Sequence, residues 1–306
     1  MKVLLKSKKK NYLVTICIDN KKLLSEWRKN ILPTWKIYCK KNDIGLIYFD
    51  KELVSKKNIF WKKPTWQRYL IGDKLKNMDV NNVCYMDTDI LINPFSPNIF
   101  RKYNKKKILV SSNIFKLPYD LEAIQKKVVF FRKNYLNKKY PLDSAIFANL
   151  KQTYGYSNLK PQKDSLCSGV VVYNVKEHAN FFKNFFYSYK KDDKSLTSGD
   201  QVFFSYYMLR YNKVELLDYK FQAYWVYEMT KHYPFLYYIK NKKIINECIE
   251  SCLMNNYFLH FAGRWSDGDM WKNIFKKQIN YNFYQRLEKY NNKKVFGKPI
   301  GFISDK

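Results

Sequence analysis

Two aspartates separated by a single residue follow an apolar stretch in the first third of the chain. Asp87 and Asp89 come directly after Val83–Met86 and are followed by the equally apolar Ile90–Ile92. Alternate residues of an extended chain share a face, so the two carboxylates point together, and burying two like charges is costly unless a cation lies between them. Oxygen ligands at this spacing suit Mg²⁺ or Mn²⁺, which keep open positions for phosphate oxygens. The spacing indicates a divalent metal site, with a solvated acidic turn as the alternative.

The glycines exclude two common ways of binding phosphates. The first glycine is Gly45, so the apolar run at 12–18 is followed by neither GxGxxG nor GxxxxGK[ST]. This excludes Rossmann dinucleotide binding, P-loop chemistry and the Gly-rich turn of a sugar-nucleotide pyrophosphorylase. Any bound phosphates must then be neutralised by side-chain cations or by a metal ion.

Short apolar runs that end in polar or Gly-containing loops predict the strands, and helical patterns lie between them. This alternation predicts an α/β sandwich with a sheet covered on both faces, in which ligands bind at the carboxyl ends of strands. Polar residues at such ends are Asp19, Asp87, Asp89, Asn174 and His260. The predicted strands are 12–19, 43–50, 82–89, 107–115, 168–174, 214–218 and 257–263, and the clearest helices are 23–31, 66–76, 120–136, 177–189 and 200–209.

Composition describes a folded and strongly basic protein. The 306 residues include 57 Lys and Arg against 26 Asp and Glu, a net charge of +31, and 46% are hydrophobic, which is far too apolar for a disordered basic tail. The length fits one catalytic-sized domain with an appended subdomain. The charge suits a nucleic-acid backbone, an anionic membrane surface or an acidic substrate such as a nucleotide sugar, and we assign about half of it to compositional drift.

Apolar runs and cysteines point to the compartment. The runs stop well short of the roughly 20 residues that span a bilayer, and the N-terminal MKVLLKSKKK lacks an apolar signal core. We therefore expect neither secretion nor membrane spanning, and a cytoplasmic location. The six cysteines form no CxxC pair with zinc-ligand spacing, so we expect reduced, mostly buried thiols.

The segment CYMDTDILI around the paired aspartates resembles the DxD strand of GT-A glycosyltransferases. The order of the flanking segments resembles that of the retaining, family 8-like enzymes that use nucleotide sugars. Cys167 and the pair Arg264-Trp265 depart from the family pattern. The similar segments are VTICID at 14–19, KPTWQRYLIGDKL at 63–75, SGVVVYN at 168–174, SGDQ at 198–201 and HFAGRW at 260–265.

The resemblance implies a GT-A fold, a Rossmann-like nucleotide-diphospho-sugar transferase with a mixed sheet flanked by helices. The catalytic domain would cover residues 1–263, with the nucleotide-sugar half at about 1–100 and the acceptor half at about 101–263. Residues 264–306 keep aromatics and Lys but lose strand patterning, so we expect a small, basic and aromatic C-terminal helical lobe.

The resemblance also implies roles for individual residues. His260 would join Asp87 and Asp89 as a metal ligand for Mn²⁺ or Mg²⁺, with an ordinary strand-end hydrogen bond as the alternative. Asp200 and Gln201 would lie at the reacting centre, and Ser198 or Asp200 could also cap the helix at 201–209, since the two roles are compatible. The residues implied to bind the nucleotide sugar are Thr15, Ile16, Cys17, Asp19, Arg68, Thr88, Ser168, Gly169, Gly263 and Arg264.

These implications predict a metal-dependent glycosyltransferase. It would move a sugar from a nucleoside-diphosphate sugar, with UDP favoured, to a glycan, lipid-linked or protein-linked acceptor, with retention. An inverting enzyme would instead need a general base, for which Asp143, Asp164 and Asp200 are candidates.

Two other functions compete with this prediction. A nucleic-acid-binding or cleaving protein would use the charge and the aromatics, but Lys and Arg are dispersed and no helix-turn-helix, RRM or zinc pattern occurs, so we expect no specific nucleic acid. Peripheral contact of the lobe at 264–306 with an anionic membrane is compatible with a lipid-linked acceptor, with a helix that closes the core as the alternative.

Overall fold

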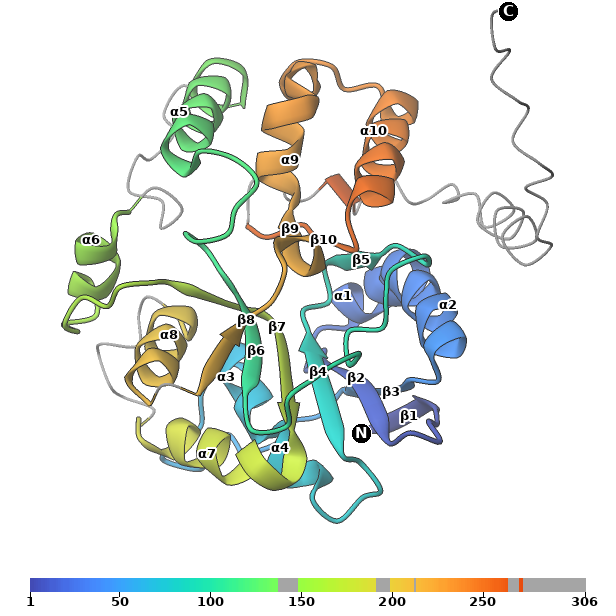
Figure 1. The fold of residues 1–306 in the computed structure, drawn as a ribbon, viewed down its shortest axis with the longest axis vertical. Helices are drawn as coiled ribbons and strands as arrows, with labels where there is room; N and C mark the ends of the chain where they lie inside the picture. The colour runs from blue at the N-terminus through green and yellow to red at the C-terminus, as the bar shows by residue number, and fades with distance from the viewer. Residues whose placement is uncertain (137–147, 191–198, 212, 264–269, 272–306) are drawn as a thin grey trace, which may run out of the picture.

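A seven-stranded mixed sheet forms the centre of the molecule in the computed structural model (Figure 1). The structure describes residues 1–136, 148–190, 199–211, 213–263 and 270–271. Strands β2, β3 and β4 are parallel, whereas β7 runs antiparallel to its neighbours β4 and β6. The strand order is β1 (Lys2–Leu5), β3 (Gly45–Phe49), β2 (Asn11–Ile16), β4 (Asn82–Met86), β7 (Leu166–Asn174), β6 (Ile108–Ser112) and β8 (Val214–Leu216).

Both faces of this sheet are covered, because successive residues of its strands enter two different cores. In β4, Cys84 and Met86 pack with Trp27 and Trp35, whereas Val83 and Tyr85 face the opposite core. The first core is covered by a π-helical turn (Trp27–Ile31), which follows α1 (Lys21–Glu26), and by α2 (Leu32–Asn42). The second is covered by α3 (Pro64–Gln67), a 3₁₀ turn (Arg68–Leu70), α4 (Ile71–Leu75), α7 (Val175–Tyr187) and α8 (Gln201–Arg210).

A second, three-stranded sheet has the order β5 (Ile90–Ile92), β10 (Phe258–His260) and β9 (Ala223–Tyr224). β5 follows β4 after three residues, and the Trp35 indole donates a 2.7 Å hydrogen bond to the carbonyl of Ile90. β10 runs antiparallel to β5, with His260 opposite Ile90. This register brings the end of β10 to the turn that joins β4 and β5.

The predicted α/β fold class is confirmed, and each of the seven predicted runs contains an observed strand. The short strands β1, β5 and β9 were not among those predicted. Each of the five predicted helices is also present, with α5 (Leu121–Phe131) at 120–136. Helices outside the predicted set are α6 (Leu150–Gly155), α9 (Trp225–His232) and α10 (Lys242–Asn255), and α5, α9 and α10 gather beyond the small sheet in Figure 1.

The six cysteines are buried and none forms a disulfide, which confirms the prediction of buried, reduced thiols. Within the described part of the chain, no helix is both long and apolar enough to cross a bilayer. Of the predicted C-terminal lobe the structure describes only Met270 and Trp271, and the Trp271 ring is buried in the same core as Trp27.

Candidate metal centre

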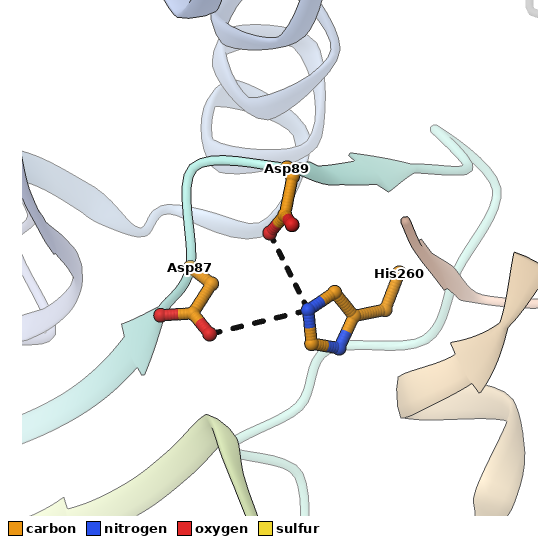
Figure 2. Close-up of side chains that lie close together, drawn as sticks. All are labelled: Asp87, Asp89 and His260. Carbon is orange, nitrogen blue, oxygen red and sulfur yellow. Dashed lines mark ion pairs between the residues drawn. The ribbon is translucent and has the colours of Figure 1, made fainter. Parts of the chain in front are cut away.

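The three residues implied as metal ligands converge at the end of β4 (Figure 2). Nε2 of His260 lies 3.3 Å from Oδ1 of Asp89 and 3.9 Å from Oδ2 of Asp87. One ligand atom from each of the three residues lies within 4.8 Å of the others. Two carboxylate oxygens and one imidazole nitrogen form a donor set that suits Mn²⁺ or Mg²⁺.

Backbone hydrogen bonds fix the chain on which these ligands stand. The amide of Asp87 donates to the carbonyl of Gly169 on β7 at 2.9 Å, and the amide of Phe261 donates to the carbonyl of Asp89 at 3.0 Å. The side chain of His260 is 3% exposed, whereas those of Asp87 and Asp89 are each 28% exposed. The cluster therefore has a buried floor and an open carboxylate side.

The two oxygens of Asp87 have different surroundings. Oδ1 accepts a 2.6 Å hydrogen bond from the Tyr85 hydroxyl and lies 3.1 Å from Nη1 of Arg68, whereas Oδ2 faces His260. This division leaves Oδ2 of Asp87, Oδ1 of Asp89 and the His260 ring directed at one point. Three protein ligands beside an open side fit a cation that keeps positions for substrate oxygens.

The charges of the cluster perturb one another. Burial raises the pKa of Asp87, and the Arg68 guanidinium opposes this shift while the neighbouring Asp89 adds to it. Burial lowers the pKa of His260, but Asp89 outweighs burial and the pKa of the ring is raised well above its usual value. A divalent cation between the carboxylates would relieve their mutual repulsion.

Arg68 forms ion pairs with two acids, Asp87 and Asp200. Its Nη1 donates to the carbonyl of Ser168 at 2.7 Å, its Nε lies 3.4 Å from Oδ2 of Asp200, and its guanidinium lies over the Tyr85 ring. The sequence implied a contact with the diphosphate. In the structure Arg68 is 6% exposed, so its visible role is to position Asp87 and Asp200.

Asp200 belongs to the same cluster. It occupies the N-cap position of α8, but its side chain makes no capping hydrogen bond and instead accepts a 2.7 Å bond from the Tyr69 hydroxyl. Capping by this side chain, the second role drawn from the sequence, is therefore wrong, and Ser198 lies outside the described residues. Gln201 is exposed in the first turn of α8.

The residues implied at the end of β2 lie in three different environments. Thr15 is fully buried, and its hydroxyl donates to the Met86 carbonyl at 2.7 Å, which ties β2 to the end of β4. Ile16 and Cys17 are buried, and burial raises the pKa of the Cys17 thiol to about 11. Asp19 has a left-handed φ of 51° and pairs with Lys56 at 2.6 Å.

The remaining implied binding residues differ in how close they lie to the cluster. Thr88 stands buried between the two aspartates, and Ser168 and Gly169 lie on β7 beside the end of β4. A Cβ on Gly169 would stand 2.5 Å from Cε1 of His260, so the missing side chain makes room for the imidazole. Gly263 is exposed with a φ of 111°. Arg264 lies outside the described residues.

The candidate bases of an inverting enzyme are not equivalent in the structure. The Asp164 carboxylate accepts 2.6 and 2.7 Å hydrogen bonds from the Ser112 hydroxyl and the Ser165 amide, and burial raises its pKa. Asp200 contacts Arg68 and Tyr69. Asp143 lies outside the described residues.

Asn174, one of the polar residues predicted at the carboxyl ends of strands, lies away from the site. Asn174 ends β7, but β7 runs antiparallel to β4, so Asn174 pairs with Asn82 at the opposite edge of the sheet, where their side chains share a 2.9 Å hydrogen bond. The rule that ligands meet strand carboxyl ends holds for parallel neighbours and fails for this strand.

Three residues of the site were missed by the sequence reasoning. Tyr85 precedes Asp87 by two positions, so strand alternation could have placed its hydroxyl beside the carboxylate. Tyr69 adjoins Arg68 in a helical pattern that predicted only packing. Gln222, whose amide lies 3.3 Å from Nδ1 of His260, precedes a strand too short to be predicted, and nothing in its own segment signals the contact.

Comparisons by sequence find no matching family model and no similar curated protein. By structure, the chain is similar to a glycosyltransferase involved in the glycosylation of the major capsid of PBCV-1, with a TM-score of 0.50, 9% identity and coverage of 87% of this chain and 100% of the other. The bifunctional glycosyltransferase WbbM has a TM-score of 0.48 and 14% identity, with coverage of 94% of this chain and 53% of the other. The glycosyltransferase GlyE of Streptococcus pneumoniae TIGR4 has a TM-score of 0.45 and 11% identity, with coverage of 92% of this chain and 63% of the other. The first of these carries the assignment of the fold. The chain has the GT-A fold of glycosyltransferases, as its sequence resemblance implied.

Proposed function

We propose that the chain is a metal-dependent glycosyltransferase that moves a sugar from a nucleoside-diphosphate sugar, with UDP favoured, to a glycan, lipid-linked or protein-linked acceptor. The observation that carries this proposal is the convergence of Asp87, Asp89 and His260 at one sheet edge of a GT-A fold. Residues of these types hold Mn²⁺ or Mg²⁺, which are the proposed cofactors.

Several residues of this chain orient or complete the proposed metal site. A divalent cation bound there supplies Lewis-acid stabilisation of the negative charge that develops on the departing diphosphate. Tyr85 and Arg68 hold Oδ1 of Asp87 and thereby turn Oδ2 toward His260. Asp89 completes the carboxylate side, which is the more exposed side of the cluster.

Asp200 and Gln201 are proposed to stabilise the cationic sugar at the reacting centre. Two observations support this role for Asp200. Arg68 joins it to Asp87. Its ion pair with Arg68 and its hydrogen bond from Tyr69 both use Oδ2, so neither of these contacts engages Oδ1. Gln201 is the next residue and is exposed. Transfer with retention remains our proposal, and inversion would require Asp143, Asp164 or Asp200 to act as base.

The donor's nucleoside is proposed to bind at the end of β2, along Thr15, Ile16, Cys17 and Asp19. The residues proposed to line the diphosphate and sugar are Arg68, Thr88, Ser168, Gly169, Gly263 and Arg264. Contact of residues 264–306 with an anionic membrane surface remains a proposal, supported by the Lys and aromatic residues of that segment. A cytoplasmic location also remains a proposal, supported by the six free, buried cysteines.

The test is release of UDP from UDP-sugars with Mn²⁺ and with EDTA. Asp89→Asn should abolish the metal-dependent release because it removes a charged ligand. Asp79→Asn is the matched control, since that carboxylate is 77% exposed and forms an ion pair with the surface residue Lys10. Turnover that survives both EDTA and Asp89→Asn would contradict the metal assignment.

A thermal-shift screen of nucleotide sugars with Mn²⁺ identifies the donor independently of turnover. A ligand that binds only the folded state raises the melting temperature, so the largest shift names the base and the sugar together. A salt titration of DNA binding addresses the competing function, because binding that disappears at moderate salt reflects generic charge.

A further inference from the structure

The two ring nitrogens of His260 face different groups. Nε2 faces Asp89 and Asp87, whereas Nδ1 lies 3.3 Å from the side-chain Nε2 of Gln222. A histidine that binds a metal through Nε2 carries its proton on Nδ1, and that proton needs an acceptor. The residue placed to supply one is Gln222.

The amide of Gln222 is buried and only half satisfied. Gln222 ends the 3₁₀ turn Tyr219–Gln222 and is 0% exposed. Its Nε2 faces both Nδ1 of His260 and the sulfur of Cys167, while its Oε1 is buried without a hydrogen-bond partner. Because Asp89 raises the pKa of the ring, Nδ1 carries a proton, and an amide nitrogen that faces it sets one donor against another.

A half-turn of this amide exchanges its nitrogen and its oxygen. Oε1 would then face Nδ1 of His260 and the Cys167 thiol, and both of these groups can donate a hydrogen. The unpaired acceptor would gain partners, which removes the cost of burying it unsatisfied. Nε2 of the ring would still face the two aspartates.

The surroundings restrict the imidazole to this place. A Cβ on Gly169 would stand 2.5 Å from Cε1 of His260 and 2.8 Å from Nε2 of Gln222, so the bare glycine lets both groups lie against β7. On its other side the ring stacks on Tyr224, with ring centroids 5.7 Å apart. These contacts leave the ring little room to turn away from Gln222.

We infer that Gln222 is a positioning residue that accepts the Nδ1 proton of His260 through Oε1 and thereby presents Nε2 to a divalent cation. Binding of the cation would release the proton on Nε2 to solvent, and the Nδ1 proton would stay on the ring. This inference rests on the metal site of the proposed function.

The experiment compares the wild type with Gln222→Met, which lacks an acceptor, and Gln222→Glu, which keeps one at the same length. Mn²⁺ affinity is measured from the electron paramagnetic resonance signal of the free ion, without substrate. Gln222→Met should bind Mn²⁺ about 10–100-fold more weakly, and Gln222→Glu should retain the wild-type affinity.

Nitrogen NMR of ¹⁵N-labelled histidine reads the tautomer directly, because the chain has only three histidines. With EDTA, Nδ1 of His260 in the wild type should carry a proton. Saturating Mg²⁺, which is diamagnetic, should remove the proton from Nε2 and leave Nδ1 protonated, and Gln222→Met should lose this fixed assignment. A merely structural residue would change the melting temperature and leave the protons of the ring alone.

The outcomes separate this inference from the proposed function. A wild type that binds no Mn²⁺ overturns the metal site and the inference together. A wild type that binds Mn²⁺, with a Gln222→Met variant of equal affinity and unchanged histidine spectra, overturns only the role of Gln222. If Gln222→Met does not fold, Gln222→Glu decides. Loss of Mn²⁺ binding by that variant overturns the inference, whereas wild-type Mn²⁺ affinity together with a proton on Nδ1 of His260 supports it.

Discussion

The guanidinium of Arg68 lies between two carboxylates, 3.1 Å from Asp87 and 3.4 Å from Asp200. Burial lowers the pKa of Arg68, but the two acids outweigh burial and raise it well above its usual value, so the side chain stays cationic. Asp87 follows β4, and Asp200 is the N-cap residue just before α8. One buried charge therefore joins the cluster of Asp87, Asp89 and His260 to the proposed reacting centre.

Replacing this charge should be costly. Arg68→Met leaves Asp87 and Asp200 without their shared cation, and breaking a buried ion pair by removing one partner typically costs about 3–5 kcal/mol. We expect a loss of that size in the free energy of unfolding, measured by urea denaturation at pH 7. Lys126→Met is the control, since its partner Glu122 is 78% exposed and an exposed pair contributes at most about 1 kcal/mol. Equal losses in the two variants would show that Arg68 does not compensate buried charge.

The hydroxyl of Tyr69 should matter for Asp200. Tyr69→Phe removes a buried donor 2.7 Å from Oδ2 and should lower the free energy of unfolding by about 1–3 kcal/mol. It should also lower Mn²⁺-dependent turnover, because the carboxylate loses one of the two groups that orient it. Tyr156→Phe, at a residue that is 60% exposed, should change stability by less than about 0.5 kcal/mol. Unchanged turnover in Tyr69→Phe would argue against a role for Asp200 at the reacting centre.

Gly169 should not tolerate even the smallest side chain. The added Cβ of Gly169→Ala would stand 2.5 Å from the His260 ring, which has Tyr224 on another side, so we expect a loss of about 1–3 kcal/mol and weaker Mn²⁺ binding. Gly155→Ala is the matched control, because a Cβ there has nothing within 4 Å, and it should be neutral or stabilising. Calorimetric melting and Mn²⁺ titration of both variants measure the two effects. Wild-type behaviour of Gly169→Ala would mean that the ring is free to move.

Local sequence and the family resemblance together selected the three residues of the proposed metal site. Asp87 and Asp89 follow the buried strand β4, which drew attention to them as a pair, and the resemblance added His260 at the end of β10. The register of β10 on β5 then brings the two strand ends together, as the family resemblance implied.

Strand direction and long-range contacts could not be predicted in the same way. An apolar run such as Val170–Val172 has the same pattern whichever way the strand runs, so Asn174 was placed at the wrong edge of the sheet. For the same reason Gly169 was not expected beside the imidazole. β5 and β9 contain three and two residues, too few to show a period, and Gln222 meets Cys167 and His260 across 55 and 38 positions. These contacts depend on tertiary packing.

The last prediction concerns pH and the buried Lys62, which lies just before the helical segment that carries Arg68. Its ammonium group donates to the carbonyls of Phe60, Phe186 and Tyr189 at 2.7–3.0 Å, and burial lowers its pKa from 10.5 to about 8. Between pH 8 and 10.5 the unfolded chain therefore holds a proton that the folded chain has lost, and stability rises with pH across this window. With a discount for solvent near the group, the gain is roughly 1–2 kcal/mol.

Lys62→Met isolates this contribution from every other group that titrates in the same range. The variant should be less stable at pH 7, by about 1–3 kcal/mol, because three carbonyls lose their donor. Above pH 8 the wild type should gain stability relative to the variant, so the difference between their urea denaturation curves should widen up to about pH 10. If the two pH profiles run parallel, the folded and unfolded chains hold the Lys62 proton equally well, and burial does not perturb this lysine.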